Sequence, residues 1–151
     1  MVHEVERGRL VRYLGERGLK QTRQREAILD VFLSARGHLT SEDILRAVRE
    51  LHSNIGYTTV YRTMKLLCEA GLANERHFDD GITRYEIEQE HHDHLVCVKC
   101  GEIIEFECEA IEASQNEIAE RYGFRLLRHR HELYGYCAAC RADAGEAPPE
   151  E

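Results

Sequence analysis

The chain has 151 residues, of which 42% are hydrophobic and 32% are charged, and its formal net charge is −8. This composition is typical of a folded globular protein and argues against a disordered one. The sequence has no apolar run of the roughly 18 residues that a membrane helix needs and no apolar secretory segment near Met1. We therefore expect a cytoplasmic protein without a membrane partner, whose cysteines are first interpreted as metal ligands rather than disulfides, apart from Cys68, which fits a small core residue, and Cys108, to which no role is assigned.

The net charge conceals an asymmetry between the two halves of the chain. Residues 1–78 contain 13 Lys and Arg against 10 Asp and Glu, whereas residues 79–151 contain 7 against 18. The front half therefore carries +3 and the back half −11. This difference indicates two tasks, and it leaves the front half suited to a polyanion such as nucleic acid.

The front half has helical periodicity. The sequence predicts a helix over Val5–Leu14, a second after an N-cap at Thr22, a third starting within Thr40–Asp43, and a fourth over Tyr57–Glu69, which Gly71 follows.

Two β-prone runs come next, Leu72–Phe78 and Ile82–Ile87, and the Asp-Gly pair between them is a hairpin signal. Helices followed by a hairpin predict a winged helix-turn-helix domain over residues 1–87.

The fourth predicted helix has two distinct faces. Val60, Met64 and Leu67 form its apolar side. The opposite side displays groups that suit contacts to bases and phosphates, namely Thr58, Tyr61, Arg62, Lys65 and Glu69. An ordinary solvated helix face explains this pattern equally well.

The back half, residues 88–151, reads as a small α/β domain with a frayed tail from about residue 142. Its predicted elements are short strands over Leu95–Val98 and Ile103–Phe106, a helix over Glu109–Tyr122, and a long final strand over Phe124–Tyr136.

Two Cys-x-x-Cys pairs are the strongest local signal: Cys97 with Cys100, and Cys137 with Cys140. Four thiolates fill the coordination shell of a tetrahedral zinc ion and leave no open position, so such a site is structural. The alternatives are a redox pair or accidental spacing.

A cluster of histidines and acids spans Glu90–His94. In a strand, His92 and His94 face one way while His91 and Asp93 face the other. Other residues that could join either set are His38, Glu86, Glu105, Glu112, His129 and His131. Such ligands suit Fe²⁺, Mn²⁺, Co²⁺ or Zn²⁺, and the alternative is a solvated polar segment.

Together these motifs resemble the ferric uptake regulator family of bacterial metal-sensing repressors, from about Gly18 to Cys140. The resemblance rests on Gly18-Leu19-Lys20, Thr59-Val60-Tyr61-Arg62, Tyr85-Glu86, the run from His91 to Gly101, Ile104-Glu105-Phe106, and the run from Tyr134 to Cys140. It implies an α+β homodimer that is not an enzyme, in which an N-terminal winged-helix domain for double-stranded DNA precedes a small α/β dimerisation domain.

The resemblance also sorts the candidate ligands. Cys97, Cys100, Cys137 and Cys140 match a structural zinc site; His38, Glu86, His92, His94 and Glu105 match a regulatory site between the domains; and His91, Asp93, Glu112 and His129 match an additional site. Tyr61 and Arg62 match recognition-helix contacts, and Lys20 matches a minor-groove contact.

The chain departs from the family pattern at Glu90, where iron regulators often carry one more histidine. The segment before His92 is therefore shorter, which makes Glu88 and Glu90 substitutes for Glu86 as a regulatory ligand. His131 is an extra histidine, either a ligand or a surface residue.

Glu86 and Glu105 favour an Fe²⁺ sensor, because similar peroxide sensors place Asp at these positions and zinc sensors tend to place Cys in the hairpin. Mn²⁺, Co²⁺ or Zn²⁺ can substitute in vitro. The expected function is repression of iron uptake genes by a dimer on near-palindromic A/T-rich operators. The alternatives are a peroxide-, manganese- or zinc-sensing relative and, from other classes, a zinc hydrolase or a metal-buffering module.

Overall fold

The structure is a computed structural model that describes residues 3–35, 37–87 and 92–142. The chain divides into two compact units, residues 1–89 and 90–151. No helix in the described ranges is both long enough and apolar enough to cross a membrane.

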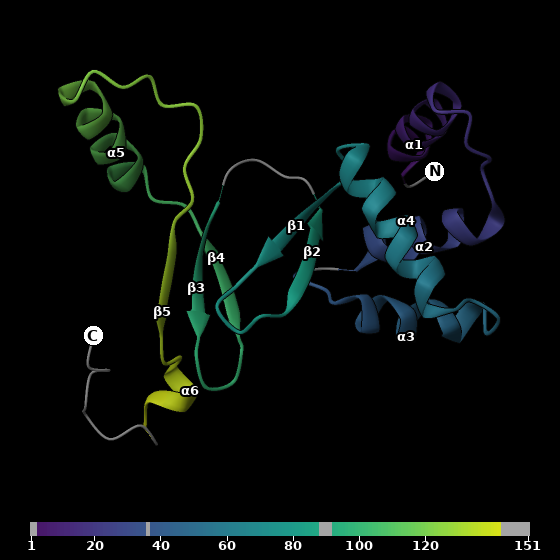
Figure 1. Cartoon of the computed structure of the whole chain (residues 1–151). Coiled ribbons are helices and arrows are strands. Elements are labelled where there is room, and N and C mark those ends of the chain that lie inside the picture. Colours follow the sequence, from purple (N-terminus) through teal and green to yellow (C-terminus); the bar gives the residue numbers. More distant parts are fainter. Residues whose placement is uncertain (1–2, 36, 88–91, 143–151) are drawn as a thin grey trace. The chain divides into compact units, whose positions relative to one another are not determined.

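The N-terminal unit consists of four helices and a hairpin (Figure 1). The helices are α1 (Glu4–Glu16), α2 (Arg23–Ser34), α3 (Ser41–Leu51) and α4 (Tyr57–Glu69), and all four were predicted. Their apolar faces meet in one core, whose fully buried members include Leu10, Ile28, Phe32, Ile44, Val60 and Met64. Burial of side chains of this kind stabilises a fold by about 1.5–3 kcal/mol each.

Side-chain caps fix where two of these helices begin. The Thr22 hydroxyl accepts a hydrogen bond from the backbone N–H of Arg25 at 3.3 Å. Thr40 and Asp43 form a capping box: the Asp43 N–H donates to the Thr40 hydroxyl, and the Thr40 N–H donates to the Asp43 carboxylate. The Thr40 hydroxyl and N–H therefore lower the pKa of Asp43.

The hairpin helps to bring the side chains of His38 and Glu86 together. Strand β1 (Ala73–His77) pairs antiparallel with β2 (Thr83–Ile87), and Gly81 has a positive φ of 72° in the turn. An isolated bridge joins Leu39 to Tyr85. Since these two residues pair, their neighbours His38 and Glu86 are brought close together.

The C-terminal unit is built on a three-stranded sheet of order β4-β3-β5 (Figure 1). Strand β3 (Asp93–Cys97) pairs antiparallel with β4 (Ile103–Phe106) and parallel with β5 (Glu132–Gly135). Helix α5 (Glu109–Arg121) connects β4 to β5, and the single-turn helix α6 (Ala138–Arg141) follows β5.

The prediction of a long strand over Phe124–Tyr136 was wrong, because only Glu132–Gly135 is a strand. The partner strand, β3, is five residues long, and its pairing with β5 begins at His94 opposite Glu132. Residues 124–130 have no ladder partner among the described residues of this chain, and His131 contributes only its carbonyl, which accepts the N–H of His94. Helix α6 was not predicted either, because a single turn is too short to show periodicity.

Candidate metal centres and the exposed face of helix α4

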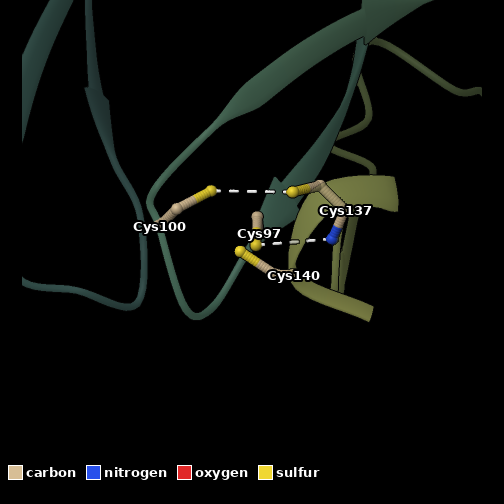
Figure 2. Close-up of side chains that lie close together, drawn as sticks. All are labelled: Cys97, Cys100, Cys137 and Cys140. Carbon is tan, nitrogen blue, oxygen red and sulfur yellow. Dashed lines mark hydrogen bonds between the residues drawn. The ribbon is translucent and has the colours of Figure 1, made fainter. Parts of the chain in front are cut away.

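The four predicted cysteine ligands come together in the C-terminal unit (Figure 2). Their sulfur atoms all lie within 4.8 Å of one another, and Sγ of Cys100 lies 3.7 Å from Sγ of Cys137. The backbone N–H of Cys137 points to Sγ of Cys97 at 3.4 Å. Four sulfurs that converge in this way fit the donor set of a closed, tetrahedral zinc site.

Strand pairing explains how cysteines so far apart in sequence meet. Cys97 ends β3, and its parallel partner in β5 is Gly135, two residues before Cys137. Gly101, with a positive φ of 76°, closes the turn after Cys100 by donating its N–H to the Cys97 carbonyl at 2.9 Å. Both Cys-x-x-Cys pairs thus lie at the same end of the sheet.

The protein environment shifts the pKa values of Cys97 and Cys140 in opposite directions. Backbone N–H groups of Cys100 and Cys137 lower the pKa of Cys97 to about 6, so this sulfur is ready to act as a thiolate at neutral pH. Burial and the neighbouring sulfurs raise the pKa of Cys140 to about 12. Like charges would repel in this group, and a bound dication offsets that repulsion.

A buried histidine–carboxylate pair lies in the N-terminal unit. Nε2 of His38 is 2.8 Å from Oε2 of Glu86, and both side chains are almost fully buried, at 5% and 3% exposed. The other Glu86 oxygen accepts a hydrogen bond from Nε of Arg76 at 2.6 Å. An imidazole nitrogen and a carboxylate oxygen at this separation can ligate one ion.

A second group of this chemistry lies in the C-terminal unit. His94 lies in β3 and His92 directly precedes this strand, and their ring centroids are 4.9 Å apart. Glu105 lies opposite His94 on β4, and its Oε1 is 3.8 Å from Nε2 of His92. Two imidazoles and a carboxylate therefore face one another without a thiolate.

The opposite face of β3 carries a third group. Asp93, Glu112 and His129 have ligand atoms within 4.8 Å of one another. Nε2 of His129 is 3.1 Å from Oε1 of Glu112 and 3.6 Å from Oδ1 of the buried Asp93. Strand alternation predicted this separation of Asp93 from His92 and His94. The other candidates on this segment, Glu88, Glu90 and His91, lie outside the described residues.

The exposed face of α4 matches the predicted one in part. Thr58, Tyr61 and Arg62 are exposed, while Val60, Met64 and Leu67 are fully buried. Lys65 is only half-buried, but its ammonium group pairs with Glu75 at 2.5 Å and lies 5.5 Å from the Tyr61 ring centroid. Lys20 is exposed in the segment before α2.

Two contacts escaped the sequence reasoning, those of Arg76 with Glu86 and of His131 with Asp93. Asn74 is the cross-strand partner of Glu86, so Arg76 is its diagonal neighbour. That relation could have been found from the hairpin register. His131 directly precedes β5, and the sequence marked it only as a residue that could join either ligand set, because its contact with Asp93 depends on the parallel pairing of β5 with β3.

Comparison with known proteins agrees with this arrangement. A sequence profile described as the ferric uptake regulator family matches residues 16–134. The ferric uptake regulation protein of Neisseria meningitidis serogroup C is 44% identical over 131 residues, which is 85% of this chain and 91% of that protein.

Solved structures match as well. The Helicobacter pylori ferric uptake regulator, described as having three functional metal binding sites, has a TM-score of 0.88 at 32% identity, over 97% of both chains. A zinc-bound manganese uptake regulator has a TM-score of 0.69 at 42% identity, over 85% of this chain and 98% of that one. The chain therefore belongs to the ferric uptake regulator family, whose members are dimeric DNA-binding transcription regulators that respond to metal ions and are not enzymes.

Proposed function

We propose that this protein is an Fe²⁺-dependent repressor of iron uptake genes, which acts in the cytoplasm as a dimer on near-palindromic A/T-rich operators. The observation that carries the proposal is the pair of thiolate-free ligand groups, one in each unit. His38 and Glu86 form one, and His92, His94 and Glu105 form the other. Imidazole and carboxylate ligands without sulfur suit Fe²⁺ and Mn²⁺ better than a thiolate-rich site does.

These two groups would hold one regulatory ion together. A dication supplies charge that compensates the buried Glu86 carboxylate and its counterparts in the C-terminal unit. Because residues of both units contribute ligands, their shared coordination restricts how the units move. This favours the DNA-binding arrangement only to the extent that the ion binds that arrangement more tightly.

Two further metal sites belong to the proposal. Cys97, Cys100, Cys137 and Cys140 hold a structural zinc ion, for which their four converging sulfurs are suited. Asp93, Glu112 and His129 form an additional site, which His91 completes according to the family resemblance. The proposed regulatory site includes Glu86, because this carboxylate lies against His38 among the residues that the structure describes.

An apolar surface on the C-terminal unit supports the dimer. Helix α5 buries none of its residues within this chain, and a pocket runs between it and the following segment. The exposed apolar residues there are Ile118, Tyr122, Phe124, Leu126 and Leu127. A second copy of the chain would cover this surface, as burial of such area drives association. Two-fold symmetry then presents two recognition helices to a palindrome, and further dimers can assemble along the DNA.

Manganese sensing is the second candidate, and the 42% identity to a manganese uptake regulator favours it over peroxide sensing. The ligand preferences of Mn²⁺ overlap those of Fe²⁺, so the ligand types of the proposed site do not distinguish the two ions.

An anaerobic fluorescence anisotropy titration tests the proposed function. The protein keeps its cysteine-bound metal, loses labile metal to a chelator, and is titrated onto an A/T-rich palindromic duplex. We expect Fe²⁺ to tighten binding and Mg²⁺ to leave it unchanged. Tightening by Mn²⁺ at lower free concentration than Fe²⁺ would favour the manganese sensor. If no divalent ion changes affinity for this duplex or for duplexes selected from random DNA, the proposal is wrong.

Arg62→Ala tests the DNA-facing surface of α4. Arg62 is exposed on the face opposite the buried Val60 and Met64, so its guanidinium can reach bases or phosphates. We expect operator affinity to fall about 5- to 150-fold, as the loss of about 1–3 kcal/mol implies. Metal content should not change.

Arg46→Ala on α3 is the matched control, because Arg46 is also an exposed arginine on a helix and pairs with Asp43 of the same helix at 3.3 Å. A loss of affinity in the Arg46 variant equal to that in the Arg62 variant would indicate a general charge effect instead of a recognition face.

A further inference from the structure

His131 contacts the buried carboxylate at the centre of the third ligand group. The Asp93 side chain is 1% exposed, and its two oxygens have different neighbours. Oδ1 faces Nε2 of His129 at 3.6 Å, while Oδ2 lies 3.2 Å from Nδ1 of His131. The two carboxylate oxygens are therefore already distinguished by the protein.

The direction of the His131 contact follows from the chemistry of the groups. An ionised carboxylate only accepts hydrogen bonds, so Nδ1 of His131 carries the proton and donates it to Oδ2 of Asp93. A ring nitrogen that carries a proton has no lone pair for a metal ion. His131 thus acts on Asp93 through Nδ1 rather than sharing an ion with it through that atom.

The imidazole of His131 is held in this orientation by the sheet. Its backbone carbonyl accepts the N–H of His94 at 3.2 Å. Its ring lies edge-to-face against Phe106, with centroids 6.0 Å apart, and Phe106 is the cross-strand partner of Asp93. Because neighbouring strands fix both ends of the contact, little side-chain entropy remains to be lost when it forms.

We propose that His131 is a positioning residue for the additional metal site: it holds Oδ2 of Asp93 and leaves Oδ1 to ligate an ion together with Glu112 and His129. This inference rests on the proposed function of that group as a metal site. Carboxylate ligands are commonly oriented by hydrogen bonds of this kind from residues outside the coordination shell.

The arrangement also affects which ions the site prefers. A carboxylate that offers both oxygens adds a donor and favours the higher coordination numbers of hard cations. A carboxylate restricted to one oxygen favours four-coordinate ions such as Zn²⁺. His131 therefore biases the additional site toward a four-coordinate ion.

The test compares His131→Leu with His131→Asn in full-length protein that also carries His38→Ala, which disables the proposed regulatory site. Leu and Asn have nearly the same shape, but the Asn amide can donate to Asp93 as Nδ1 does. Protein with its cysteine sites zinc-loaded and its labile metal removed is titrated with Zn²⁺ and with Co²⁺. The visible Co²⁺ absorption reports coordination number, because four-coordinate Co²⁺ absorbs more strongly than six-coordinate Co²⁺.

We expect His131→Leu to weaken Zn²⁺ binding about 10- to 100-fold and to reduce the Co²⁺ absorption, whereas His131→Asn stays near the parent protein in both. Equal loss in both variants would make His131 a ligand and overturn the positioning role. If neither variant changes Zn²⁺ affinity or Co²⁺ absorption, the positioning role of His131 is also wrong, although the additional site itself would still stand. If His129→Ala removes none of the metal ions that the parent protein binds, the proposed additional site is wrong. The inference about His131 is then wrong as well.

Discussion

We expect replacement of Cys97 with Ser to abolish zinc binding by the four cysteines and to unfold the C-terminal unit. Cys97 is the most buried of the four cysteines, and its sulfur receives the N–H of Cys137, so it connects β3 to the segment after β5. Structural zinc sites contribute an apparent binding free energy of about 10–16 kcal/mol in zinc-finger peptides. Few domains have a net stability greater than this.

The C-terminal unit has little else to compensate for that loss. The core cluster of buried apolar residues belongs entirely to the N-terminal unit, and α5 contributes no buried residue in this chain. We expect zinc content measured by mass spectrometry to fall by one ion per chain. The thermal transition of the C-terminal unit should disappear, while helical circular dichroism from the N-terminal unit persists.

Cys108→Ser provides the matched control. Cys108 is a half-buried cysteine of the same unit, at the N-cap of α5, and it lies outside the group of four sulfurs. The zinc content and the thermal transition of the Cys108→Ser variant should equal those of the wild-type protein. Unchanged zinc content in Cys97→Ser would refute the structural assignment of the four-cysteine site.

The elements that sequence reasoning predicted correctly are those that short-range chemistry determines. The caps at Thr22 and Thr40 mark helix starts because their hydroxyls satisfy N–H groups within three residues along the chain. The period-two alternation at the start of β3 and in the residue before it separates His92 and His94 from Asp93 for the same local reason. These signals needed no knowledge of tertiary structure.

The features that escaped prediction depend on pairing between distant segments. The length of β5 depends on its pairing with β3, and this pairing begins at His94 opposite Glu132. Arg76 reaches Glu86 through the hairpin register, and His131 reaches Asp93 through a parallel pair of strands separated by a helix. A sequence without an alignment specifies such partners only weakly, because many registers satisfy the same apolar pattern.

We expect replacement of His92 with Ala to remove metal-dependent operator binding but to leave a folded, zinc-containing dimer. The His92 side chain is 8% exposed and faces His94 and Glu105, so its loss removes an imidazole from the proposed regulatory ligands without disturbing the cysteine group. Coupling between an effector and a second ligand is typically about 1–3 kcal/mol, or 5- to 150-fold in affinity. The variant should lose this entire gain and bind the operator with the affinity of the metal-free wild type.

His52→Ala is the control for this variant, because His52 is an exposed histidine that follows α3 and belongs to none of the three ligand groups. It should retain the full response to Fe²⁺ in the anaerobic anisotropy titration. Size-exclusion chromatography with light scattering should find dimers for both variants, which separates loss of sensing from loss of assembly. If Fe²⁺ increased the operator affinity of the His92→Ala variant as much as that of the wild type, regulation would have to act through another group of ligands. The candidate would then be the group of Asp93, Glu112 and His129, which also lacks a thiolate and belongs to the described part of the C-terminal unit.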